Sequence, residues 1–513
     1  MPDNSIGREI PSEILAQFSR NMFAGAYVNT PHVRQDKGNR TLPRLNKLVD
    51  NLEQVIVKTG LKDGMTISFH HHFRDGDKVV NLVMEAISQM GIKNLTVAAS
   101  SLSAVHSPMV KHITDKTVSR IFTSGLRGEL ADAISNGIMD NPVLIHSHGG
   151  RARAIESGQI QIDVAFLGVP SCDVYGNANG YTGRSACGSL GYAKVDAGHA
   201  RKTVLLTDNL VEYPNTPFSI HQDEVDYIVV VDEVGNPEGI GTGATRLTKN
   251  PKDILIGSLA AKVIACSGYF EDGFSFQTGS GGASLIATNF IRDYMLAQNI
   301  KAAWALGGIT GQMVALHEEG LIKRLLDVQS FDREAIRSIG ENRYHTEIDA
   351  SYYANPLNKG CAVNKINVVV LSALEIDTDF NVNVLTGSDG VLRGASGGHC
   401  DTAVGAGLTV VVAPLIRGRS ATVLERVQTV ITPGATVDVL VTDRGVAVNP
   451  RRPRVEEQLR KNRIPIIPIA ELQQKAERMV GKPEPVQYEK KIVAVVEYRD
   501  GTIMDVVRQV RIQ

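Results

Sequence analysis

Residues 66–77, TISFHHHFRDGD, contain the pattern that decides the fold class: a short run rich in β-branched residues ends in polar residues, and a segment with helical spacing follows. The same alternation returns at LTVAASSLSAVH (95–106), SRIFTSGLRG (119–128), VLIHSHGGR (143–151) and DVAFLGVPSCD (163–173). Alternating strand and helix patterns are typical of crossover units in a mainly parallel sheet that is covered on both faces. The sequence therefore predicts an α/β fold.

A second series of strand patterns begins from about residue 265. Its strand candidates are FSFQT (274–278), KAAWAL (301–306), INVVVLSALEI (366–376), FNVNVLTG (380–387), LTVVVAPL (408–415) and VDVLVTD (437–443). Two such series imply two open, mainly parallel sheets in one chain. Apolar residues recur at helical spacing from Phe290 to Leu296, which indicates that the GSGG turn at 279–282 opens a helix.

We therefore expect four segments along the chain. A polar, basic arm outside the sheets covers residues 1–50, a first lobe covers 51–262, and a second lobe covers 263–480. Two apolar runs flank Asp500-Gly501, which is a strong hairpin signal, so residues 481–513 are predicted to form a small docked cap without chemistry of its own.

Composition excludes several classes of protein. Lys plus Arg (54) nearly balances Asp plus Glu (55), so the net charge of −1 gives no field to gather nucleic acid or a membrane surface. The five cysteines are spaced singly, which suits a reducing compartment. No run of about 18 apolar residues and no secretory signal is present, so we expect a cytoplasmic protein.

Two glycine-rich turns in the second lobe are the strongest candidates for chemistry, QTGSGG (277–282) and LRGASGGH (392–399). Their free backbone N–H groups could bind an oxyanion or a carboxylate, and at Gly281 and Gly282 the start of the next helix would help. Neither turn is followed by the G-K-S or G-K-T of a nucleotide-binding loop. The alternative is that the glycines only permit tight turns and close packing.

His70, His71 and His72 end the first predicted strand. Successive side chains of a strand point to opposite faces, so only His70 and His72 could share a metal ion, and no glutamate lies among them. Open α/β sheets bind ligands at the C-terminal ends of their strands, which favours contact with a carboxylate substrate. Structural hydrogen bonding is the alternative.

Several arginines lie in or beside strand-end loops, where a guanidinium can bind a carboxylate through two hydrogen bonds. We expect one or two of them to contact substrate; they are Arg74, Arg127, Arg151, Arg153, Arg184 and Arg393.

Two weaker motifs are interpreted structurally. Gly239-x-Gly241-x-x-Ala244 matches the dinucleotide fingerprint, but no strand leads directly into it, so we interpret it as a loop. Cys172 and Cys187 would need a histidine such as His146 or His148 beside them to act as nucleophiles, and packing is the favoured interpretation.

The longest blocks of this sequence resemble the citrate lyase alpha subunit family, and the resemblance extends from about residue 50 to the terminal hairpin. These blocks include SFHHHFRDGD (68–77), IHSHGGRARAIESGQIQIDVAFLGVPSCDVYGNANGYTG (145–183), GFSFQTGSGGASL (273–285), VVVLSALEIDTDFNVNVLTGSDGVLRGASGGHCDTA (368–403) and DVLVTDRGVAVNPRRP (438–453). The resemblance implies two lobes like those of CoA transferases.

It also implies a reaction. Ordinary CoA transferases of this fold carry a nucleophilic glutamate at the end of a second-lobe strand, but here KAAWAL runs into Gly307-Gly308. This departure, and the replacement of their first-lobe glycine turn by His70 to Phe73, fit direct attack of citrate on an acetyl thioester in a ternary complex. We assign the oxyanion role to Gly281, Gly282, Gly397 and Gly398, and substrate binding to His70, His71, Arg74, Ser124, Arg127, Ser280, Gly307, Gly308, Arg393 and Ser396.

The resemblance further implies that acetate is exchanged for citrate on the phosphopantetheine-like arm of an acyl-carrier protein (gamma subunit), and that a beta subunit then cleaves the citryl thioester. Activity as a citrate CoA-transferase on CoA thioesters and a homo-oligomer within the complex are expected as well. No metal and no cofactor bound by this chain are expected.

Two rival functions remain open at this stage. A free-standing CoA transferase with a covalent glutamate would need an essential glutamate near the cleft, and Glu375 in VVVLSALEI is the nearest substitute. Glu375 could equally be a buried carboxylate paired across its strand. The other rival is a sensing module that binds a small acid without turnover, but residues 1–50 contain no convincing helix-turn-helix.

Overall fold

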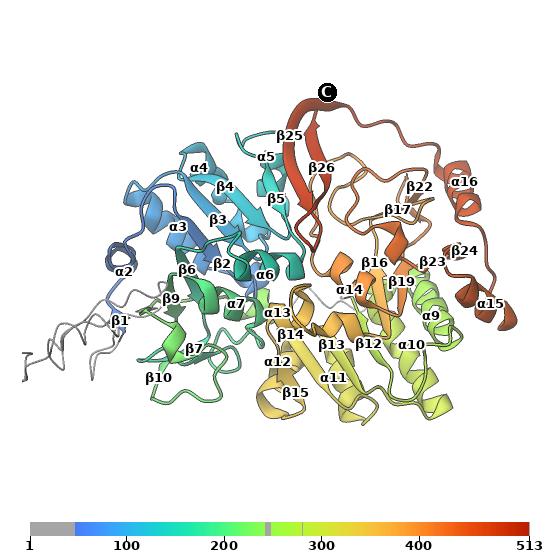
Figure 1. The fold of residues 1–513 in the computed structure, drawn as a ribbon, viewed down its shortest axis with the longest axis horizontal. Helices are drawn as coiled ribbons and strands as arrows, with labels where there is room; N and C mark the ends of the chain where they lie inside the picture. Colours follow the sequence, from blue (N-terminus) through green and yellow to red (C-terminus); the bar gives the residue numbers. More distant parts are fainter. Residues whose placement is uncertain (1–46, 242–247, 280, 512–513) are drawn as a thin grey trace, which may run out of the picture. The chain divides into compact units, whose positions relative to one another are not determined.

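The computed structural model describes residues 47–241, 248–279 and 281–511. Nearly all of the predicted arm and Ser280 lie outside the described residues. The part from Leu48 onward forms one compact unit that contains both predicted lobes (Figure 1).

The first lobe is built on a ten-stranded sheet. From one edge to the other its strands are β1 (Leu48–Val49), β11 (Tyr227–Val230), β9 (Lys202–Thr207), β6 (Val164–Gly168), β2 (Thr66–Phe69), β3 (Leu95–Ala99), β4 (Val118–Thr123), β5 (Val143–Ile145), β25 (Tyr488–Glu497) and β26 (Ile503–Val510). All neighbouring pairs are parallel except β25 with β26. The helices that follow these strands are α2 (Leu52–Thr59), α3 (Val79–Gln89), α4 (Met109–Thr114), α5 (Gly128–Ser135), α6 (His148–Glu156), α7 (Gly191–His199) and α8 (Pro237–Gly241).

The second lobe is built on an eight-stranded sheet. Its strand order is β15 (His345–Glu347), β14 (Leu325–Ser330), β13 (Trp304–Ile309), β12 (Ser275–Thr278), β16 (Val368–Ser372), β19 (Leu408–Val412), β23 (Val439–Thr442) and β24 (Gly445–Val448), parallel except for β23 with β24. Its helices are α9 (Pro251–Ala265), α10 (Gly282–Gln298), α11 (Gly311–Glu318), α12 (Arg333–Glu341), α13 (Ala350–Ala354), α14 (His399–Gly405), α15 (Pro453–Lys461) and α16 (Ile469–Val480).

Small sheets lie beside the main ones. The first contains β10 (Leu210–Val211), β7 (Ser171–Asp173) and β8 (Ala178–Asn179); the second contains β18 (Val382–Asn383), β17 (Glu375–Asp377) and β22 (Val423–Leu424); and a ribbon joins β20 (Ile416–Arg417) to β21 (Ser420–Ala421).

The two main sheets repeat one topology. In the first, β2, β3, β4 and β5 run outward from the centre on one side and β6, β9 and β11 on the other; β12, β13, β14, β15 and β16, β19, β23 do the same in the second. The turn after β2 (His70–Phe73) therefore corresponds to the turn after β12 (Gly279–Gly282). The predicted α/β fold with two open, mainly parallel sheets and a C-terminal hairpin is confirmed.

Four segments differ from the sequence prediction. Leu48 and Val49, expected in the arm, pair with β11 at the edge of the first sheet. Residues 251–262, expected in the first lobe, belong to α9, whose Ile256 and Ala260 pack in the core of the second sheet because this helix lies against α10. Of the motif Gly239-x-Gly241-x-x-Ala244, interpreted as a loop, Gly239 and Gly241 belong to the short helix α8, and Ala244 lies outside the described residues.

The fourth difference is the hairpin, which is more than a cap. Ala494 to Val496 of β25 pair in parallel with Val143 to Ile145 of β5, so the hairpin extends the first sheet. In Figure 1 it stands beside β5, with the second lobe on its other side.

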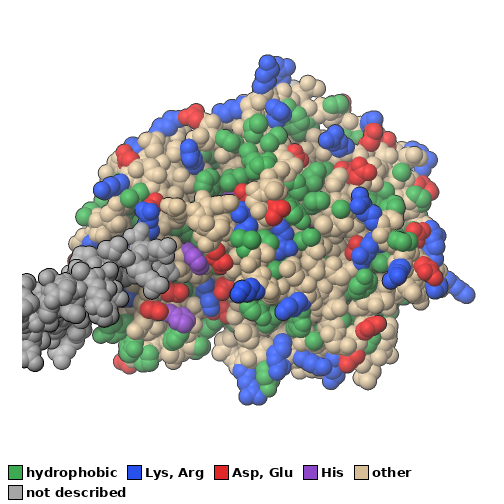
Figure 2. Space-filling model, viewed as in Figure 1, with side chains coloured by type: hydrophobic (Ala, Val, Ile, Leu, Met, Phe, Trp, Pro, Cys, Tyr) green, Lys and Arg blue, Asp and Glu red, His purple; other side chains and the backbone are tan. Residues whose placement is uncertain are grey.

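The lobes meet through a continuous apolar core. Leu306, Val328 and Tyr353 of the second lobe are buried in the same hydrophobic cluster as the first-lobe strands. On the face drawn in Figure 2, basic and acidic side chains are interspersed, in keeping with the balanced charge of the sequence. In the described part of the chain, no helix is long and apolar enough to cross a membrane.

Candidate functional site

The glycine-rich turn 394–398 of the second lobe lies directly against the end of β4 in the first lobe. The N–H of Ser396 donates to the carbonyl of Ser124 over 2.7 Å, and the N–H of Leu126 donates to Gly394 over 3.0 Å. Gly125 permits this approach, because a Cβ there would lie 2.2 Å from the Cβ of Ala395. Ser124 and Ser396, predicted from distant segments, are thus neighbours across the lobe boundary.

Helix α6 meets the same turn at its first residue. Ser147 caps the helix by accepting from the N–H of Gly150, and the N–H of His148 donates to the carbonyl of Gly397 over 2.8 Å. Gly397 has a φ of +54°, in the left-handed region that favours glycine. The backbone shape of the turn therefore favours glycine at this position.

Asp401 fixes the start of α6 from the second lobe. Its carboxylate accepts from the N–H of Gly149 and from the hydroxyl of Ser147, each over 2.9 Å. Arg499 of the hairpin lies 3.5 Å from the same carboxylate. Burial raises the pKa of Asp401 to about 6, and Arg499 opposes that rise.

Three rings fill the space between α6, α7 and the end of β2. His71 stacks on His148 and Tyr192, with ring centroids 5.5 Å and 4.7 Å away, and His148 lies 4.5 Å from Tyr192. The Nδ1 of His71 is 2.6 Å from the hydroxyl of Ser100. Burial lowers the pKa of His71 well below its usual value and that of His148 to about 3, so both rings are neutral at physiological pH.

The other predicted glycine turn lies beside the first. His399, the residue after Gly398, places Nε2 3.1 Å from the carbonyl of Ser372, and the hydroxyl of Ser372 lies 2.7 Å from that of Ser284. Gly281 caps α10 and packs against Ser372, since a Cβ there would lie 2.9 Å from the Ser372 hydroxyl. The two turns thus occupy adjoining strand ends of the second sheet.

Four predicted glycines offer free donors. Among the described residues, no acceptor is found for the N–H groups of Gly281, Gly282, Gly397 and Gly398. Next to them, the hydroxyl of Tyr353 and the side-chain amide of Gln277 are 3.2 Å apart, and Gln277 packs on Gly307. We call the two glycine turns and the residues around them the cluster: Ser124, Ser396, His71, His148, Tyr192, Gln277, Tyr353 and Asp401. The donors named here are all neutral groups.

Both ring nitrogens of His70 have partners within the first lobe, and its assignment to substrate binding stays a prediction. Its Nε2 donates to the carbonyl of Gly168 over 2.7 Å and its Nδ1 accepts from the N–H of His72. His72 in turn accepts from the N–H of Tyr192. These contacts favour the alternative of structural hydrogen bonding for His70 and His72.

Arg74 is also committed elsewhere. Its guanidinium donates to the carbonyls of Ser330 and Phe331 of the second lobe, both at 2.5 Å, and its carbon lies 4.6 Å from the centre of the Phe331 ring. Burial lowers its pKa to about 10. Gly308 provides space for this ring, since a Cβ there would lie 2.0 Å from it. Arg74 thus joins the turn after β2 in the first lobe to the end of β14 in the second.

The remaining arginines lie at the surface or in buried pairs. Arg127 is exposed at the N-cap of α5, and Arg393 is half exposed and pairs with Asp389 at 2.5 Å, so its charge is already compensated. Arg151 makes a buried two-pronged pair with Asp196, and Arg153 pairs with Glu497. Arg151 and Arg153 are thus used in buried pairs, and the assignment of Arg127 and Arg393 to substrate binding stays a prediction.

Gly307 and Gly308 lie inside β13, at a β-bulge opposite β14, where Gly307 has a φ of +99°. They continue the strand beyond the predicted KAAWAL. No carboxylate stands at this position.

The family model described as "Citrate lyase, alpha subunit (CitF)" matches residues 45–510. The chain belongs to the citrate lyase alpha subunit family. It is 57% identical to the citrate lyase alpha chain of Klebsiella pneumoniae over 489 residues, which are 95% of this chain and 96% of that relative. The expectation from the sequence blocks is thereby confirmed.

Solved structures agree with this family assignment. A Streptococcus mutans structure, described as the alpha subunit of citrate lyase in complex with citrate, is 54% identical and superimposes with a TM-score of 0.92 over 99% of this chain and 100% of its own. A Pseudomonas malonate decarboxylase hetero-tetramer in complex with malonate has a TM-score of 0.63 at 13% identity, over 85% of this chain and 86% of that chain. The latter shares only the CoA-transferase-like fold.

In this member of the citrate lyase alpha family, the side chains of the rival nucleophiles are buried. Glu375 accepts from the side-chain amide of Asn383, its partner across β17 and β18, over 2.8 Å, and burial raises its pKa. Burial also raises the pKa of the Cys187 thiol, and the Cys172 thiol donates to the carbonyl of Asp173. Within the described ranges, no group of three His, Cys, Asp or Glu side chains could hold a metal ion.

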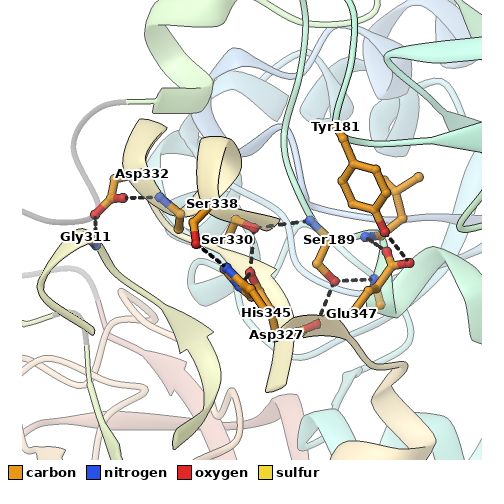
Figure 3. A network of polar contacts seen from close by, with 12 residues as sticks. Tyr181, Ser189, Gly311, Asp327, Ser330, Asp332, Ser338, His345 and Glu347 are labelled. Carbon is orange, nitrogen blue, oxygen red and sulfur yellow. Dashed lines mark hydrogen bonds and ion pairs between the residues drawn. The ribbon is translucent and has the colours of Figure 1, made fainter. Parts of the chain in front are cut away.

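A buried polar network joins the two lobes beside β14 and β15 (Figure 3). Asp327 lies 3.0 Å from the Nε2 of His345 and accepts from the hydroxyl of Ser330, which in turn accepts from the N–H of Ser189. Glu347 accepts from the N–H of Leu190 over 2.5 Å. These contacts join first-lobe residues to second-lobe strands.

Four residues of the cluster were not predicted to belong to it from the sequence: His148, Tyr192, Tyr353 and Asp401. His148 follows a serine at the start of a helix pattern, which is a recognisable cap, but its role depends on the second-lobe turn that it meets. Ser280 lies outside the described residues and keeps its status as a prediction.

Proposed function

We propose that this chain exchanges acetate for citrate on a carrier-bound thioester, converting acetyl carrier and citrate into citryl carrier and acetate by direct attack within a ternary complex. The observation that supports it is the convergence of both glycine turns with Ser124, Ser396 and His71 at the lobe boundary. Citrate as the substrate is supported by the citrate complex of the Streptococcus mutans relative.

The chemistry needs donors more than it needs a base. Citrate carboxylates are ionised at pH 7, so one of them can attack the acetyl thioester without losing a proton. The attack produces a tetrahedral oxyanion and then a mixed anhydride, and the released thiolate attacks the citryl carbonyl through a second oxyanion. Each preorganised N–H donor is worth roughly 3 kcal/mol at such a step. Gly281, Gly282, Gly397 and Gly398 would supply them.

The same residues argue for the absence of a covalent enzyme intermediate. Gly307 and Gly308 occupy the strand where the CoA-transferase resemblance implies a glutamate, and Glu375 is engaged by Asn383. With Arg74, Arg127 and Arg393 engaged elsewhere or at the surface, citrate would be held by N–H groups, hydroxyls and the neutral His71. This arrangement would suit an anion that must be released after each turnover.

The family's alpha component would work beside two others. We propose a small acyl-carrier subunit whose phosphopantetheine-like arm reaches the cluster, and a beta subunit that cleaves the citryl thioester. Activity on CoA thioesters, a homo-oligomer within a cytoplasmic complex, and no cofactor or metal in this chain complete the proposal.

The test is acyl exchange. The purified chain is incubated with acetylated carrier protein and isotopically labelled citrate, and products are identified by mass spectrometry. Labelled citryl carrier and free acetate, with no acylated form of this chain, are expected. A covalent adduct on the chain would overturn direct attack, and tight citrate binding without exchange would favour a sensing role.

A further inference from the structure

His148 has a ring whose two nitrogens see different surroundings. Its Nδ1 is buried and has no hydrogen-bond partner among the described residues. Its Nε2 lies on the side of Gly397: a Cβ built on Gly397 would be 3.7 Å from this nitrogen, and no other atom of the described residues, the chain neighbours of Gly397 aside, lies within 4 Å of that Cβ. The described residues therefore leave space beside Nε2 at the turn that carries the N–H groups of Gly397 and Gly398.

The groups around His148 keep it neutral. His71 and Tyr192 pack against its ring, and Arg151, paired with Asp196, contributes a positive charge from the same helix. From the second lobe, Asp401 is occupied by Ser147, Gly149 and Arg499. Burial is the main reason that the pKa of His148 falls to about 3.

A neutral imidazole carries one proton, and burial indicates where it lies. A proton on Nδ1 would leave a buried donor without an acceptor, which is rarer in proteins than an unpaired acceptor. A proton on Nε2 leaves only the Nδ1 lone pair unpaired and directs the N–H into the open space beside Gly397.

We propose that His148 donates its Nε2–H to the carbonyl oxygen of the acyl thioester and so completes the oxyanion site with the N–H groups of the Gly397 turn; this rests on the proposed acyl exchange. When a citrate carboxylate oxygen bonds to the thioester carbon, the π electrons of the thioester carbonyl move to the carbonyl oxygen, which becomes the oxyanion. They return when the carbon–sulfur bond breaks and thiolate leaves. His148 keeps its proton throughout.

The stack explains why this donor is rigid. The ring is fixed by His71 and Tyr192, and its backbone by Gly397 and the Ser147 cap, so little reorganisation is needed as charge develops. A protonated imidazole would bind the ground-state carboxylates of citrate as strongly as the oxyanion. A neutral donor avoids that competing attraction.

Variants separate the donor from the packing. His148→Leu removes the N–H and should lower kcat for acyl exchange by roughly 100-fold with KM little changed, whereas His148→Gln places an amide N–H near the same point and should recover part of the rate. His112→Leu is the matched control, because His112 is a buried histidine with an unpartnered Nδ1 on α4, outside the cluster. It should leave the rate unchanged.

Nitrogen-15 NMR of the histidine-labelled chain gives a readout other than activity. The ring signals of His148, assigned by their loss in His148→Gln, should show the Nε2–H tautomer and stay constant from pH 8 to pH 5. The Nδ1–H tautomer, a titration near pH 6.5, or exchange by His148→Leu at the native rate would each overturn the inference alone. A native chain that exchanges no acyl group would overturn the proposed function and this inference with it.

Discussion

The backbone N–H of His148 donates to the carbonyl of Gly397 over 2.8 Å, and this bond joins the first residue of α6 in one lobe to the glycine-rich turn of the other. Ser147 caps the helix that begins at His148, and Gly397 has a backbone conformation that disfavours other residues. The position of the lobes and the shape of the cluster are therefore set by the same contact.

Gly397→Val should cut acyl exchange at least about tenfold, because its side chain would fill the space beside His148 Nε2 where the thioester oxygen is expected. The variant will also lose stability, since a left-handed backbone costs a residue with a Cβ about 1–2 kcal/mol or more. Gly418→Val is the matched control: its φ of +61° is similar and nothing lies within 4 Å. Equal losses of melting temperature with unequal losses of rate are expected, and equal losses of rate would assign Gly397 to packing.

Gly281→Val tests the other turn. A Cβ there would lie 2.9 Å from the Ser372 hydroxyl, so the valine would displace Ser372 and disturb its contact with Ser284. The φ of Gly281 is −72°, an ordinary value, and backbone strain is therefore small. We expect a fall in kcat much larger than the fall in melting temperature, measured by exchange assays and calorimetry. A parallel fall of both would show that the turn serves the fold.

Glu375→Gln should leave acyl exchange intact. The amide oxygen can still accept from Asn383, and a neutral side chain suits a site where burial already raises the pKa of the carboxyl. Melting temperature at pH 8 should stay equal or rise. Loss of exchange in a folded variant would restore the covalent glutamate mechanism, and mass spectrometry of the chain after incubation with acetyl carrier would detect the adduct.

Arg499→Met should destabilise the chain by roughly 3 kcal/mol, because it leaves the buried Asp401 carboxylate without its charged partner. Arg511→Met in the same hairpin is the control: Arg511 pairs with Glu489, but its side chain is 64% exposed, and such pairs contribute little. Urea denaturation measures both. If the two variants lose equal stability, the hairpin tip does not support the start of α6 through Asp401.

Because of His399, the free energy of unfolding should decrease as the pH falls below 6.5. Burial lowers its pKa from 6.5 to about 4, so below pH 6.5 the unfolded chain binds a proton that the folded chain refuses. Stability from this residue is complete above pH 6.5 and is lost at about 1.4 kcal/mol per pH unit on the way down to pH 4. Between pH 7.5 and pH 5, His399→Gln should therefore lose less melting temperature than the native chain. His221→Gln, at a side chain 55% exposed, serves as control and should follow the native chain.

The local sequence pattern was enough to predict the two sheets. It did not predict which side chains face the contact between the lobes. His70 to His72 were expected to end the first predicted strand, but β2 ends at Phe69 and they lie in the turn after it, where alternation does not apply: the His72 ring lies 6.0 Å from that of His71 and 5.2 Å from that of Tyr192. Arg74 lies in a strand-end loop as predicted, but its acceptors are carbonyls 256 and 257 residues later in the sequence. Asp401 lies in the quoted block 368–403 and Arg499 beside the hairpin signal, but no local pattern predicts their roles, because burial and a distant partner give each its role.

His146, just after β5, meets Glu497 at the end of β25, 351 positions further along the chain. On the ribosome, the first lobe thus emerges with the edge of β5 unpaired, and the whole second lobe is translated before the strand that covers it. During that interval this edge offers unsatisfied N–H and C=O groups to any other nascent chain. Maturation of the first lobe is therefore set by the time needed to synthesise the second, and we expect chaperones that shield strand edges to act on this protein late in its translation.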